Sequence, residues 1–186
     1  MNCSTIVDLL QYRSLHENQK NQNIYTFLQD GETEAGSLSY QELEKKARAI
    51  GAYLQSLNAY GNRVLLLYSP GLEFITGFFG CLYAGAIAVP AYPPRPDQTL
   101  DRLDAIVSDA EAKFAFTTTS LVNYLQSRFA ENPKLMAVNL IATDNITNTN
   151  EADWHQPEIN TDTLAFLQYT SGSTGAPKGV MISHGN

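Results

Sequence analysis

The most constraining feature of the sequence is a long apolar stretch in its first half, which divides into three segments. Val64 to Tyr68 is a continuous β-prone run, typical of a strand that is buried on both faces. Ser69-Pro70-Gly71 interrupts the run, and Leu72 to Ala84 resumes with helical character until Gly85, a residue suited to end a helix. Ala86 to Val89 then predicts a second strand. Strand, helix and strand joined by short links form a βαβ unit, which predicts a parallel sheet with a right-handed crossover.

Strands and helices are predicted on both sides of this unit. Ser39 and Glu42 have the spacing of a capping box, and apolar residues at steps of three and four follow them, which predicts a helix. Residues 143–162 are polar and predict a surface connection. The remaining predicted elements are helices at 5–13, 99–110 and 120–130 and strands at 24–29, 113–117, 135–142 and 164–169. This alternation predicts an α/β fold, a partial parallel sheet built of βαβ units.

Composition and charge exclude several classes of protein. Hydrophobic residues make up 44% of the 186 residues, which excludes intrinsic disorder and supports a packed core. The net charge is −7 and the sequence contains no run of Lys or Arg, so nucleic-acid binding is not expected. Phe74 to Pro94 is 21 residues without a charge, close to the length of a membrane span. Interspersed Gly, Thr and Pro residues dilute its apolar character, so no membrane span is predicted.

Cysteine usage and the N-terminal residues bear on the cellular compartment. Cys3 and Cys81 are the only cysteines, and the three histidines are scattered without ligand spacing, so neither a disulfide framework nor a metal cluster is predicted. Residues 1–10 lack a basic start and meet Asp8 before any long apolar segment, unlike a secretion signal. A cytoplasmic location is therefore expected.

The segment from Tyr169 to Gly179 carries most of the chemical information in the sequence. It holds four Ser and Thr hydroxyls, three glycines and Lys178, which is the only charged residue after Asp162. Glycines let backbone amides converge on an anion, and hydroxyls and an ammonium group add donors that phosphate oxygens accept. The pattern is not a Walker A motif, because Pro177 precedes the lysine and a glycine follows it. Apolar runs on both sides predict a strand–loop–strand arrangement that binds phosphate; a mobile Gly/Ser connection without a ligand is the alternative.

Residues Tyr169 to Val180 closely resemble the phosphate-loop signature of the adenylate-forming, or AMP-binding, superfamily. This superfamily includes acyl-CoA synthetases, luciferases, nonribosomal adenylation domains and fatty acyl-AMP ligases. The resemblance extends over most of the chain, from about Ile24 to Asn186. The local sequences at 88–94, 166–169 and 183–186 look most like the fatty acyl-AMP ligase branch.

The resemblance implies that a fatty acid is activated with ATP and Mg²⁺. The acid oxygen attacks the α-phosphate to give an acyl-adenylate and pyrophosphate, and the acyl group then passes to the thiol of an acyl carrier protein. Lys178 would neutralise the leaving pyrophosphate, and Thr170 would lie near the Mg²⁺ ion. By matching positions, the residues expected to hold the β- and γ-phosphates are Thr170, Ser171, Gly172, Ser173, Thr174, Gly175 and Lys178.

The resemblance also implies that residues 1–186 are an incomplete N-terminal AMP-binding domain, with the phosphate loop at 169–180. Family members continue past this loop into the rest of the domain and a small C-terminal domain, so no catalytic residue is expected within this chain. We predict that the chain is inactive alone, because a phosphate clamp by itself does not orient an acid against ATP. The alternatives are a piece of an acyl-CoA ligase or of a nonribosomal adenylation domain, or a truncated subdomain without chemistry. The parent enzyme would be free-standing or part of a polyketide or nonribosomal synthase.

Overall fold

The computed structural model of the chain describes residues 3–146, 151–171 and 177–186. The helices are α1 (Ile6–Leu15), α2 (Tyr40–Ser56), α3 (Leu72–Ala84), α4 (Asp101–Ala110), α5 (Thr119–Phe129) and α6 (Pro133–Met136), with 3₁₀ turns η1 (Thr143–Asn145) and η2 (Glu151–Asp153). The strands are β1 (Asn23–Leu28), β2 (Glu34–Ser39), β3 (Arg63–Leu67), β4 (Ile87–Ala91), β5 (Phe114–Thr117), β6 (Asn139–Ala142), β7 (Leu164–Ser171) and β8 (Pro177–Ser183).

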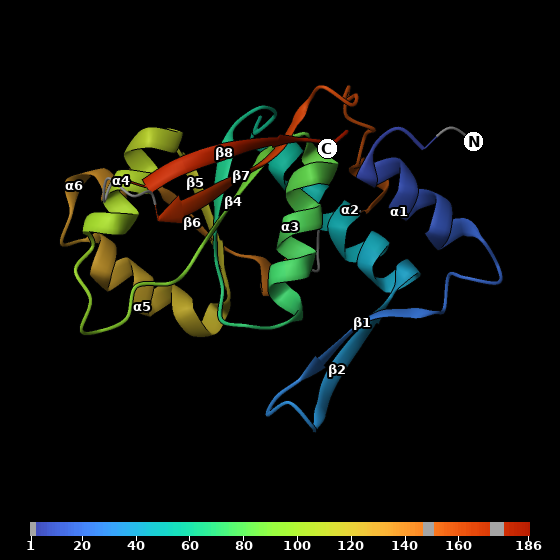
Figure 1. Ribbon diagram of the computed structural model, residues 1–186, viewed down its shortest axis with the longest axis horizontal. Coiled ribbons are helices and arrows are strands. Elements are labelled where there is room, and N and C mark those ends of the chain that lie inside the picture. Colours follow the sequence, from blue (N-terminus) through green and yellow to red (C-terminus); the bar gives the residue numbers. More distant parts are fainter. Residues whose placement is uncertain (1–2, 147–150, 172–176) are drawn as a thin grey trace.

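A six-stranded, mostly parallel sheet forms the centre of the molecule (Figure 1), in the order β6-β5-β3-β4-β7-β8. Strand β3 pairs in parallel with β4 and β5, β5 pairs in parallel with β6, and β4 pairs in parallel with β7. Only the β7–β8 pair of this sheet is antiparallel. The predicted α/β class with a βαβ unit at β3-α3-β4 is therefore confirmed. A separate antiparallel hairpin, β1–β2, projects away from the body of the molecule (Figure 1).

Helices cover both faces of the sheet, because consecutive residues of the buried strands point to opposite sides. Leu65 and Leu67 of β3 pack with α4, α5 and α6, whereas Val64 and Leu66 pack with α2 and α3. Figure 1 shows the two groups of helices on opposite sides of the strands. Helix α1 packs against α2 and α3 through Val7, so it extends the second layer.

Local sequence signals define the helix ends of this core. The Ser39 hydroxyl accepts a hydrogen bond from the Glu42 amide, and the Glu42 carboxylate accepts one from the Ser39 amide, which is the predicted capping box. Helix α3 has the predicted bounds and ends at Gly85, whose φ of 67° is left-handed. Helices α2 and α3 pack so closely at Gly80 that a Cβ at this position would lie 2.3 Å from Ile50 Cγ2.

The structure differs from the sequence-based prediction at two segments. The strand predicted over 135–142 is wrong in its first half, because Asn132 caps a short helix that begins at Pro133, and the strand starts only at Asn139. The strand at Glu34–Ser39 was not predicted; it pairs with β1 across the Asp30-Gly31 turn.

The polar connection after β6 is held to the protein by Trp154. Its indole N–H donates to the Tyr83 carbonyl at 2.8 Å, and the Arg48 guanidinium lies 4.6 Å from the centre of the indole ring. Most of its described residues are exposed, as predicted for a surface connection, and Trp154 attaches it to α2 and α3.

The uncharged 21-residue segment, Phe74 to Pro94, consists of most of α3, the strand β4, the short link between them and the irregular residues that follow β4. Among the described residues, no helix has the length and apolarity that crossing a membrane requires.

Candidate functional site

The predicted phosphate loop connects the two strands of the β7–β8 hairpin. Thr170 lies directly opposite Lys178, and Ser171 lies opposite Pro177, so these residues form the base of the loop. Thr170 and Lys178 are exposed to solvent. The predicted strands on both sides of the loop are confirmed. The other predicted phosphate-binding residues, Gly172, Ser173, Thr174 and Gly175, lie outside the described residues.

The hairpin places the base of this loop at the carboxyl edge of the parallel sheet. Strand β7 runs parallel to β4, with Phe166 opposite Ala88, so its last residues lie at the same edge as the ends of β3, β4 and β5. Ligands of open α/β sheets bind outside the carboxyl ends of the strands. Thr170 and Lys178 are therefore at the edge of the sheet where the fold favours ligand binding.

Tyr169 anchors the base of the hairpin to α4. Its side chain is 6% exposed, and its hydroxyl donates a hydrogen bond of 2.6 Å to the Asp109 carboxylate in the last turn of α4. Burial, together with this carboxylate, raises the pKa of the Tyr169 hydroxyl well above its ordinary value. The hydroxyl is therefore protonated at neutral pH and acts as a hydrogen-bond donor within the protein. Tyr169 therefore holds the end of β7 against α4.

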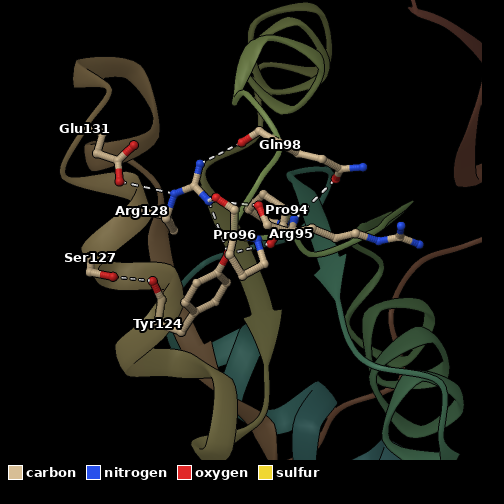
Figure 2. A network of polar contacts seen from close by, with 8 residues as sticks. All are labelled: Pro94, Arg95, Pro96, Gln98, Tyr124, Ser127, Arg128 and Glu131. Atoms are coloured by element: carbon tan, nitrogen blue, oxygen red, sulfur yellow. Dashed lines mark hydrogen bonds and ion pairs between the residues drawn. The ribbon is translucent and has the colours of Figure 1, made fainter.

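A network centred on Arg128 of α5 holds the proline-rich segment that leaves β4 at the same edge (Figure 2). The guanidinium donates to the Arg95 carbonyl at 2.9 Å and to the Gln98 carbonyl at 2.9 Å. The Tyr124 hydroxyl donates to the Pro94 carbonyl at 2.8 Å. Because proline has no backbone N–H, a proline-rich segment cannot satisfy its own carbonyl groups. Tyr124 and Arg128 of α5 donate hydrogen bonds to these carbonyls instead.

Buried hydroxyls fill the space at the carboxyl ends of β3 and β5. The hydroxyls of Tyr68 and Thr143 are 2.8 Å apart, and Thr143 donates to the Thr117 carbonyl at 3.3 Å. Burial raises the pKa of the Tyr68 hydroxyl above its ordinary value, so this hydroxyl stays protonated and hydrogen-bonds within the protein.

No group of His, Cys, Asp and Glu side chains suited to a metal ion is present in the described ranges. Cys3 and Cys81 are both free thiols, and burial raises the pKa of the Cys81 thiol. Within the described chain, this edge exposes the hydroxyl of Thr170 and the ammonium group of Lys178, which can donate hydrogen bonds to an anion. Sequence reasoning missed Asp109, Tyr124 and Arg128 as supports of this edge, because their partners lie far away in the sequence.

Known proteins resemble this chain over nearly its whole length. The medium-chain-fatty-acid–[acyl-carrier-protein] ligase JamA of Moorena producens is 49% identical over 98% of this chain, which spans 31% of JamA. The long-chain-fatty-acid–AMP ligase FadD32 of Mycobacterium marinum is 39% identical over 79% of this chain and 23% of its own length. The chain therefore spans about a third or less of the length of these relatives.

The crystal structure of the fatty acyl-adenylate ligase from L. pneumophila, in complex with acyl adenylate and pyrophosphate, matches with a TM-score of 0.86 and 40% identity. It covers 98% of this chain and 31% of that protein. The family model of AMP-binding enzymes matches residues 15–186, which include all of the central sheet and the β7–β8 hairpin. The chain belongs to the family of AMP-binding enzymes.

Proposed function

We propose that this chain is the N-terminal part of a fatty acyl-AMP ligase, and that residues 169–180 bind the phosphates of ATP. The observation that carries the proposal is the pairing of Thr170 with Lys178 at the carboxyl edge of the sheet. The relatives named as fatty-acid ligases, which align with nearly the whole chain, support the choice of substrate. In this proposal residues 1–186 form an incomplete AMP-binding domain.

The reaction joins a fatty acid to AMP. A carboxylate oxygen of the acid attacks the α-phosphorus, the bond from this phosphorus to the bridging oxygen breaks, and pyrophosphate leaves. The hydroxyls of Thr170, Ser171, Ser173 and Thr174, the amides near Gly172 and Gly175, and the Lys178 ammonium group would hold the β- and γ-phosphates. Such donors stabilise the charge that develops on the leaving group.

Mg²⁺ enters the proposal with ATP, because the phosphates supply the hard oxygen ligands that this ion prefers. The Thr170 hydroxyl, exposed at the base of the loop, would supply one further oxygen ligand. The metal would reduce the repulsion between the phosphates and the incoming carboxylate. The acyl group would then pass to the thiol of an acyl carrier protein; the name of JamA gives an acyl carrier protein as the acceptor for that protein.

Titration of the ¹⁵N-labelled chain with MgATP and with inorganic pyrophosphate, followed by NMR, tests the clamp. One contact from a charged group contributes about 1.5–3 kcal/mol, so Lys178→Ala should weaken binding by about ten- to a hundredfold. The matched control is Lys113→Ala, because Lys113 is exposed and precedes β5 at the opposite edge of the sheet. Equal affinities for the wild type and Lys178→Ala would refute the clamp.

Two assays test the remaining parts of the proposal. The chain alone should not catalyse fatty-acid-dependent exchange of pyrophosphate into ATP, and clear turnover would contradict the predicted inactivity. In a version of the protein that carries the rest of the domain, a labelled fatty acid should transfer to a holo-acyl carrier protein. Transfer to coenzyme A instead would assign the chain to the acyl-CoA ligases.

A further inference from the structure

The contact between Tyr169 and Asp109 joins the phosphate hairpin to a helix that is itself fixed to the sheet. Helix α4 packs on the sheet through Leu103, Ile106 and Val107. Asp109 lies in its last turn and accepts the Tyr169 hydroxyl at 2.6 Å. This bond therefore links β7 to an exposed carboxylate on a helix that packs on the sheet.

The Tyr169 ring also lies close beneath β8. Gly179 stands directly opposite Tyr169, and a Cβ at this glycine would lie 2.9 Å from the Cζ atom of the ring. A side chain at position 179 would push the ring or the strand aside. The Tyr169 side chain, which belongs to β7, thus also packs against β8 at Gly179.

This contact is adjacent to the residues proposed to bind phosphate. The Tyr169–Gly179 pair is followed immediately by the Thr170–Lys178 pair. The register between β7 and β4 is set further from the loop, at Phe166 and Ala88. Between that pair and the loop, the Tyr169 hydroxyl supplies a directional bond that fixes how the hairpin sits relative to α4.

We propose that Tyr169 and Asp109 form a positioning pair, which holds the β7–β8 hairpin so that Thr170 and Lys178 face the phosphates together. The inference rests on the proposed phosphate clamp and adds a role for two residues that do not contact the ligand. Tyr169→Phe removes the hydroxyl and keeps the ring under Gly179, and Asp109→Ala removes the acceptor. Asp109→Asn keeps a side-chain oxygen that can accept the same hydrogen bond.

The experiment is NMR titration of the chain and its variants with inorganic pyrophosphate and with MgATP. Tyr169→Phe and Asp109→Ala should each weaken binding at least about fivefold, the double variant should be no weaker than either, and Asp109→Asn should restore most of the affinity. The control is Tyr60→Phe, which also loses one tyrosine hydrogen bond, to the Glu158 carbonyl at 2.8 Å, but near the amino ends of β3 and β4. It should bind as the wild type does.

The outcomes separate this inference from the proposed function. Wild-type affinity in Tyr169→Phe and Asp109→Ala, together with a loss in Lys178→Ala, would overturn the positioning pair and leave the clamp intact. An equal loss in Tyr60→Phe would show a general effect of stability and would also overturn it. If Lys178→Ala binds as the wild type does, the clamp fails and the positioning role fails with it.

Discussion

Replacement of Arg128 by Met should destabilise the protein by about 3 kcal/mol. The Arg128 side chain is 12% exposed, and its guanidinium makes two hydrogen bonds of 2.9 Å, to the carbonyls of Arg95 and Gln98. Each bond from a charged donor contributes about 1.5–3 kcal/mol, and we take the lower end because the exposed carbonyls regain water. The ion pair with Glu131, whose side chain is 58% exposed, adds less than about 1 kcal/mol.

Urea unfolding followed by circular dichroism measures this loss. In a domain of this size about 3 kcal/mol corresponds to a fall in Tm of roughly 6–12 °C. Met keeps the apolar stem of the side chain, so the loss reports the guanidinium contacts. Arg102→Met is the matched control, because Arg102 is exposed on α4, and its effect should stay within about 0.5 kcal/mol. A loss below about 1 kcal/mol for Arg128→Met, or one equal to that of Arg102→Met, would refute the reasoning.

Three further predictions concern packing and titration. Gly80→Ala should cost about 1–3 kcal/mol, because the new methyl would lie 2.3 Å from Ile50 Cγ2; unfolding at wild-type stability would contradict the close packing of α2 and α3. Three hydrogen bonds from Glu32 and Thr33 in the following turn lower the pKa of the Asp30 carboxyl to about 2. The ionised carboxylate therefore stabilises the folded protein fully above about pH 4, and this contribution is lost as the pH falls through about 2. A ¹³C NMR titration midpoint near 4 would disprove this. Trp154→Phe should cost about 0.5–1.5 kcal/mol by removing the bond to the Tyr83 carbonyl, and thermal unfolding at the wild-type Tm would contradict it.

Elements whose signals are local were predictable from the sequence. The bounds of α3 follow from Pro70-Gly71 before it and Gly85 after it, and the start of α2 follows from the Ser39 capping box. The strands of the βαβ unit follow from their unbroken apolar runs. In these segments local preference and tertiary packing favour the same structure.

The features that sequence reasoning missed depend on partners that are distant along the chain. Strand β2 has a weak pattern of its own and is defined by pairing with β1. The bond from Trp154 to Tyr83 is likewise non-local, and a lone tryptophan in a polar segment carries no such information. At the candidate site, the loop composition indicated phosphate binding, whereas Asp109 is identified only once the fold places it beside Tyr169.

The reversal of direction at the last strand of the sheet has a consequence for the order of folding. β7 and β8 are close in sequence and pair with each other, so this hairpin can form within about 1–10 μs. Its attachment at Ala88–Phe166 must instead close a loop that contains α4, α5 and β6, and such distant contacts form slowly. The hairpin should therefore join late, as a preformed unit, so that pulse-labelled amides of β3 gain protection from exchange before the amides that bond β7 to β4 do.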